Sequence, residues 1–103
     1  MEFEDWDDME SKFDPVDNPD ERVSWFSVAS FYEGVGVLLK QNLIDISMVD
    51  DLMATSIRLS WEKIGPFELE SRKRFNLPRL WDGFEYLYIE LMKYHEKHPE
   101  LKT

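Results

Sequence analysis

The sequence of residues 23–39 is VSWFSVASFYEGVGVLL, and Glu33 is the one charged residue among its seventeen positions. A transmembrane helix needs about 20 predominantly apolar residues, so this stretch is too short, and too rich in Ser and Gly, to span a membrane. A helix that is apolar on nearly all sides is normally buried between partners. The stretch therefore predicts a central helix that other helices enclose on more than one face.

The negative charge of the chain is concentrated at its N-terminal end. Residues 1–21 contain ten acidic residues and one basic residue, a net charge of −9, whereas residues 22–103 contain twelve acidic and eleven basic residues, a net charge of −1. A nearly neutral domain without a basic stripe does not favour nucleic-acid binding. The acidic end would be repelled by an anionic membrane. We therefore expect neither nucleic-acid binding nor membrane insertion.

The chain contains no Cys, which excludes disulfides, thiolate zinc sites and cysteine nucleophiles. The absence of Cys fits a reducing compartment, and the sequence shows no basic segment followed by an apolar one of the secretory kind. We therefore expect a cytoplasmic location.

Three segments follow from the composition: an acidic amphipathic arm at 1–18, a helical domain at 19–98 and a polar tail at 99–103. In the arm, Phe3, Trp6 and Phe13 are spaced as on one side of a helix, among acidic residues. We expect this short helix to pack on its own domain; a segment that seeks a partner and a disordered segment are the alternatives.

Within the domain the apolar spacing predicts three longer helices and no strands. The fold class is all-α: a three-helix up-down-up bundle with a short acidic N-terminal helix and a Gly-Pro break in the middle long helix. The predicted ranges are 19–41 for the first helix, 47–64 and 67–74 on either side of Gly65-Pro66 for the second, and 78–95 for the third.

Small residues predict where two of these helices meet. Ser27, Ser30 and Gly34 lie on one side of the first helix, and Ser56 and Ser60 lie four apart on the second. A glycine inside a helix costs about 1 kcal/mol relative to alanine. We expect the two rows to cross, because close approach of the helices would offset that cost.

Three groups of residues carry a resemblance to a known family. They are Phe31 to Lys40 (FYEGVGVLLK) with Leu43-Ile44-Asp45, then Trp61-Glu62 with Pro66 and Arg72, and finally Phe84-Glu85 with Leu87. With these groups the chain resembles prokaryotic proteins catalogued as domain of unknown function 4760. The resemblance implies a small helical domain without an assigned activity, and it supplies no catalytic residues.

No pattern in the sequence indicates catalysis, a cofactor or a metal site. His95 and His98 have no third ligand and lie near a helix end. Asp50 and Asp51 are interpreted as solvated helix surface, since acid–base catalysis requires a desolvated carboxyl group. No Gly-rich phosphate loop and no Ser-His-acid set is visible. We expect a protein that is not an enzyme.

Glu33 is the most informative charge, because a buried carboxylate needs a cationic partner. We expect a structural ion pair with Arg72 or Arg58; an exposed position and a ligand-binding role are the alternatives. Arg72, Arg74 and Arg79 belong to a cationic cluster that can bind a phosphate, an acidic partner or the acidic arm itself.

The chain has four Trp, four Tyr and seven Phe residues, more than a domain of this size can hide. Candidate interaction residues are Trp81, Tyr86 and Ile89 on the outer side of the last helix, with Phe3, Trp6 and Phe13 of the arm. We expect a non-enzymatic protein–protein interaction module that self-associates, with a homodimer favoured. One alternative is an acidic decoy that occupies a basic nucleic-acid-binding site. The other is a small-ligand sensor with a pocket lined by Trp61, Tyr32 and Tyr88.

Overall fold

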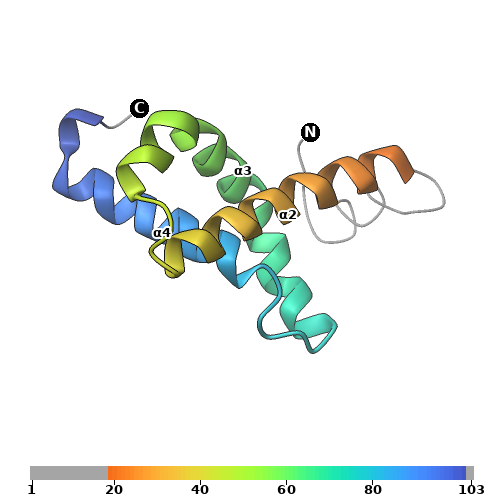
Figure 1. Ribbon diagram of the computed structural model, residues 1–103. Coiled ribbons are helices and arrows are strands. Elements are labelled where there is room, and N and C mark those ends of the chain that lie inside the picture. The colour runs from red at the N-terminus through yellow and green to blue at the C-terminus, as the bar shows by residue number, and fades with distance from the viewer. Residues whose placement is uncertain (1–18, 102–103) are drawn as a thin grey trace.

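The computed structural model describes residues 19–101, with side chains from residue 24 onward. Three α-helices are followed by one 3-10 turn: α2 (Pro19–Lys40), α3 (Ile46–Arg74), α4 (Asp82–Lys97) and η1 (Pro99–Leu101). No strand occurs among the described residues. The helices pack together as a bundle (Figure 1), so the predicted all-α class is confirmed.

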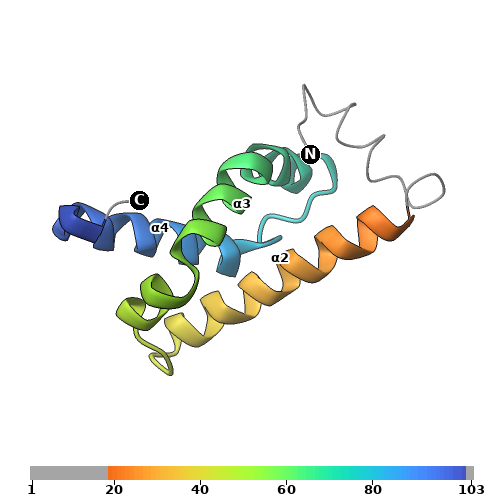
Figure 2. The same cartoon turned by 90° about the horizontal axis from the view of Figure 1, so that it is seen from above.

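The core is built around α4. Both α2 and α3 make their main contacts with α4, and its residues Phe84, Leu87 and Leu91 are completely buried. Ala29 of α2 and Ile57 of α3 are completely buried against them. The prediction that α2 is the enclosed central helix is therefore wrong. One side of α2 is buried, and its N-terminal end projects beyond the other two helices (Figure 2).

The small residues of α2 do not meet α3 as predicted. Ser27, Ser30 and Gly34 are exposed, and a Cβ added at Gly34 would have no described atom within 4 Å. The close approach occurs at Gly36, where an added Cβ would lie 2.5 Å from the carbonyl carbon of Gly83. Two positions along a helix correspond to a rotation of about 200°. The two glycines of α2 therefore face nearly opposite directions, and the one that permits close packing faces α4.

Capping hydrogen bonds stabilise the turn between α2 and α3. Asn42 adopts a left-handed conformation with φ of 59°, and the backbone N–H of Leu43 donates to the oxygen of Leu38 at 3.0 Å. This is a Schellman motif, in which Asn is tolerated at the left-handed position. The Asp45 side chain then accepts from the N–H of Ser47 at 3.1 Å and caps α3.

The break predicted at Gly65-Pro66 is not found. α3 continues through both residues, and the one position inside it with non-helical angles is Met53, with φ of −150° and ψ of 21°. A Cβ at Gly65 would lie 2.7 Å from the indole of Trp61. Gly65 therefore makes room for Trp61, and the packing of this buried ring offsets the one hydrogen bond that Pro66 removes.

Candidate interaction surface

The carboxylate of Glu33 caps the start of α4. Its Oε1 accepts a hydrogen bond from the backbone N–H of Phe84 at 3.0 Å. The N-cap residue of α4, Trp81, is left-handed with φ of 58° and provides no side-chain cap. The first N–H groups of a helix lack partners and carry partial positive charge. The predicted ion pair of Glu33 with Arg72 or Arg58 is replaced by this contact with a helix terminus.

Two glycines make this contact possible. A Cβ at Gly83 would lie 2.6 Å from Oε2 of Glu33, and a Cβ at Gly36 would overlap the carbonyl group of Gly83. Without side chains at these two positions, the backbones of α2 and α4 approach closely. The carboxylate of Glu33 can then reach the end of α4.

Asp82 and Arg79 form an exposed pair beside this junction. The Nε atom of Arg79 lies 3.4 Å from Oδ2 of Asp82. Partial burial acts to raise the pKa of the Asp82 carboxyl, but the hydrogen bond from Arg79 and the positive charges of Lys40 and Arg79 outweigh it, so the pKa lies below its ordinary value. The side chain of Arg79 is 91% exposed.

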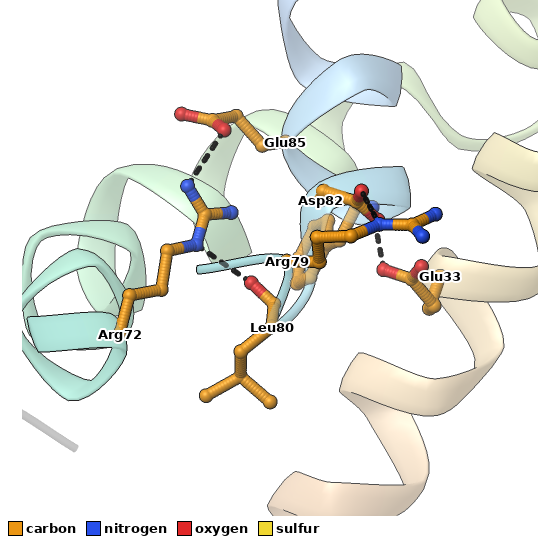
Figure 3. Close-up of polar contacts among 7 residues, drawn as sticks. Glu33, Arg72, Arg79, Leu80, Asp82 and Glu85 are labelled. Carbon is orange, nitrogen blue, oxygen red and sulfur yellow. Dashed lines mark hydrogen bonds and ion pairs between the residues drawn. The ribbon is translucent and has the colours of Figure 1, made fainter. Parts of the chain in front are cut away.

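Arg72 holds the connection between α3 and α4. Its Nε donates to the backbone oxygen of Leu80 at 2.7 Å, and its Nη1 lies 2.9 Å from Oε1 of Glu85 (Figure 3). Arg72 is thus a structural residue, and the turn that it closes delays the start of α4 to Asp82, beyond the predicted start at residue 78. Arg74, also predicted as a ligand candidate, lies near Glu70 at 3.1 Å with 48% of its side chain exposed.

The three predicted interaction residues of α4 have different surroundings. Trp81 is partly buried and meets the ring of Phe26 edge to face, with centroids 5.5 Å apart. Tyr86 is partly buried beneath the ammonium group of Lys40, which lies 5.1 Å from the ring centroid. Ile89 is exposed. The predicted interaction residues Phe3, Trp6 and Phe13 lie outside the described residues.

Exposed apolar side chains lie along α2 outside its buried side, and Phe26, at one edge of this surface, also meets Trp81. About 100° of rotation per residue places Ser27, Ser30 and Gly34 in one row, which runs between two pairs of larger residues. We call this surface the outer face of α2, and its residues are Phe26, Ser27, Ser30, Phe31, Gly34, Val37 and Leu38. All seven are exposed, and because Glu33 points to α4, the face carries no charge.

The sequence interpretation missed a buried polar pair. Nε2 of His95 lies 2.5 Å from Oδ1 of Asp50, and the two side chains are only 4% and 9% exposed. The pair joins the end of α4 to the beginning of α3. A signal for it was present, since His95 falls on the same side of the last helix as Leu87 and Leu91. Among the residues that the structure describes, no three His, Asp or Glu side chains are placed to hold a metal ion.

The open hollows of the described part of the chain include the following two. One, of about 610 Å³, lies at the turn between α2 and α3 and is lined partly by Leu43 and Met48. The other, of about 440 Å³, lies along residues 50–56 of α3. The three aromatic residues predicted to line a ligand pocket belong to neither hollow. The rings of Trp61 and Tyr32 pack against Phe84 with centroids 5.0 and 5.1 Å away, and the hydroxyl group of Tyr88 donates to Glu62 at 2.8 Å.

None of the helices within residues 19–101 is sufficiently long and apolar to cross a membrane. Searches of curated proteins and of solved structures give no significant match. The model of the family described as domain of unknown function (DUF4760) matches residues 2–91, a range that contains α2, α3 and α4 up to Leu91. The chain therefore belongs to the DUF4760 family, as its resemblance predicts.

Proposed function

We propose that this protein is a cytoplasmic, non-enzymatic protein–protein interaction module in which an up-down-up bundle presents the outer face of α2 to a second copy. The supporting observation is the exposure of large apolar side chains on an uncharged helix face, led by Phe26 at 60% and Phe31 at 57%. Exposed apolar patches larger than a few hundred Å² commonly mark interaction sites.

The size of the face sets the expected strength of the dimer. An aromatic side chain buries about 150–250 Å², so Phe26 and Phe31 together offer roughly 200–300 Å² at their observed exposures. Val37 and Leu38, at 43% and 42% exposure, raise the total to roughly 300–450 Å² per chain. A standard interface buries about 800 Å² per partner. We therefore expect a reversible dimer with a Kd on the order of micromolar or weaker.

A second copy suits this face because two uncharged, apolar surfaces can pair without desolvating a charge. Exposed Gly34 carries the helix-propensity cost of glycine without a close contact to any described residue. In a dimer, the row of Ser27, Ser30 and Gly34 lets the partner helix approach closely, and this contact offsets the cost. An isologous pair about a two-fold axis uses the same face on both chains.

The charge distribution favours an antiparallel pair. An antiparallel crossing near Ser30 and Gly34 brings Phe26 of one chain opposite Leu38 of the other. It also separates the two acidic N-terminal ends by roughly the length of α2, about 33 Å for 22 residues. That separation exceeds the Debye length of about 8 Å at physiological ionic strength. A parallel pair would bring together two segments that each carry a net charge of −9.

Sedimentation equilibrium on the full chain, from roughly 1 µM to 1 mM, tests the proposal over the range of the expected Kd. Wild type should show a monomer–dimer equilibrium. Phe31→Glu adds a charge to the outer face and Gly34→Leu fills its central row, so both should remain monomeric. The matched control is Leu52→Glu, on α3, where the side chain is 71% exposed. This variant should dimerise like wild type.

A wild-type chain that stays monomeric at the highest concentration would refute the proposal. So would a dimer that survives Phe31→Glu and Gly34→Leu and is lost in Leu52→Glu, because the contact would then involve α3. Circular dichroism of each variant establishes that the helices are intact and that the loss of the dimer is not a loss of the fold.

A further inference from the structure

A second exposed surface, separate from the outer face of α2, lies where α3 gives way to the connection before α4. Residues 71–81 contain four basic residues and no acidic one, in a chain whose net charge is −10. Arg72 points inward to Leu80 and Glu85. The remaining cations and their apolar neighbours form what we call the basic-apolar patch: Leu69, Lys73, Arg74, Phe75, Leu77 and Arg79.

Both kinds of side chain in the patch are accessible. Leu69, Phe75 and Leu77 are 39%, 57% and 49% exposed, Lys73 is exposed, and the Arg79 side chain is 91% exposed. The patch therefore offers apolar area with positive charge at its edges. A fitting ligand has aromatic or aliphatic side chains interleaved with carboxylates, since Arg binds carboxylates through charge-assisted hydrogen bonds and aromatic faces through cation–π contact.

We propose that the basic-apolar patch binds the acidic N-terminal segment of the same chain, residues 1–18. This segment contains eight acidic residues and one basic residue, with Phe3, Trp6 and Phe13 among them. Its pattern of apolar residues between carboxylates is the complement of the patch.

The segment is tethered on the correct side of the molecule. It joins α2 at Pro19, and Trp25, less than two turns later, donates from Nε1 to Oε1 of Glu68 at 3.2 Å. Glu68 lies about 9 Å along α3 from Arg74, at 1.5 Å per residue. Eighteen residues span about 27 Å as a helix and about 60 Å when extended. The tether therefore reaches the patch in either conformation.

Attachment to the same chain also favours this occupant over an external anion. Attachment through a short stretch of chain gives an effective concentration on the order of millimolar. A free polyanion such as a nucleic acid would instead be repelled by the net charge of −10. In this arrangement the segment neutralises the patch and leaves the outer face of α2 available, so the inference does not depend on the proposed dimer.

Paramagnetic relaxation on the full chain tests the inference. Because the chain has no Cys, Ser11→Cys provides a unique position for a nitroxide label. In the ¹⁵N-labelled protein, the amide signals of Phe75, Leu77 and Arg79 should lose intensity, and Leu101 of η1, which follows the C-terminal end of α4, serves as the distant reference. Signal should return in roughly 1 M salt, where the Debye length falls to about 3 Å.

Charge reversal supplies the matched comparison. The triple variant Lys73→Glu, Arg74→Glu, Arg79→Glu should lose the broadening. The control variant Lys93→Glu, Lys97→Glu should retain the broadening. It is matched because it also reverses the charge of exposed cations in the last two turns of a helix, in this case α4. If the triple variant unfolds, Trp6→Ser with Phe13→Ser tests the same contact from the other side. That variant should also abolish the broadening.

A mixture of ¹⁵N-labelled chain without nitroxide and unlabelled chain with nitroxide separates intramolecular from intermolecular contact. Broadening that occurs when one chain carries both the ¹⁵N label and the nitroxide, and that is absent from the mixture, supports the inference. Broadening of equal size in the mixture, no broadening at the patch, or broadening that the triple reversal leaves unchanged overturns it.

Discussion

Replacing each of two nearby glycines of α2 by alanine should change stability in opposite directions. Gly34→Ala and Gly36→Ala both gain about 1 kcal/mol of helix propensity. At Gly34 the new methyl group meets no described atom within 4 Å, so the gain remains. At Gly36 the Cβ would lie 2.5 Å from the carbonyl carbon of Gly83, where ordinary contact begins at 3.4 Å.

The size of the loss at Gly36 follows from the junction that it occupies. α2 and α4 must separate by about 1 Å, and overpacking of this kind costs about 1–3 kcal/mol. The same movement lengthens the bond from Phe84 to Glu33, and hydrogen bonds to charged groups contribute about 1.5–3 kcal/mol. After the propensity gain is subtracted, Gly36→Ala should be destabilised by roughly 1.5–5 kcal/mol.

Thermal unfolding monitored by far-ultraviolet circular dichroism measures both effects. A change of 1 kcal/mol shifts the Tm of a domain of this size by about 4–8 °C, so Gly34→Ala should unfold about 4–8 °C above wild type and Gly36→Ala at least about 6 °C below it. Dimerisation makes Tm depend on protein concentration, so comparing Tm at low and high concentration separates its contribution from that of the fold. If Gly36→Ala unfolds at or above the wild-type temperature, the inferred close approach of α2 and α4 is wrong.

Three further predictions concern the polar groups that join the helices. Glu33→Ala removes the cap on the N–H of Phe84 and should lower the free energy of unfolding by about 1.5–3 kcal/mol in urea titrations, while Glu33→Gln, which keeps an acceptor, should lose less. Because the pKa of Asp82 is depressed in the folded chain, its ionised form stabilises the fold above a pH of about 4. This contribution disappears as the pH falls through the folded pKa. In acid titrations Asp82→Asn should therefore lose less stability below that pH than wild type. Asp50→Ala leaves the buried ring nitrogen of His95 without its hydrogen-bond partner and should cost about 1–3 kcal/mol, and retention of wild-type Tm by this variant would contradict a buried pair.

The sequence was informative wherever a local rule sets the outcome. Apolar spacing predicts three helices and no strands in the domain, and the first of them, predicted at residues 19–41, is observed as Pro19–Lys40. The start of the last helix was misplaced, because the contacts of Arg72 and the left-handed conformation of Trp81 shape the preceding turn. The apolar spacing of the sequence gives no indication that these residues are in contact.

The candidate site was only partly predictable for the same reason. Glu33 stands out in the sequence as a lone charge, but its partner is a backbone N–H 51 positions away, which no residue type identifies. Electrostatics alone pointed to Arg72 or Arg58. The pair of Asp50 and His95 was missed because each residue was interpreted within its own helix.

The helical class, the family and the concentration of the net negative charge in residues 1–21 follow from the sequence alone, because these depend on residue type and on spacing along the chain. The tertiary structure decided which helix is central and which glycine is a contact. α2 is apolar on nearly all sides, so its sequence is compatible with burial of any face. Two contacts with α4 determine which side of α2 is buried: the N-terminus of α4 is capped by the carboxylate of Glu33, and Gly83 of α4 lies against Gly36. With α2 in this orientation about its axis, Gly34 and its neighbours face outward.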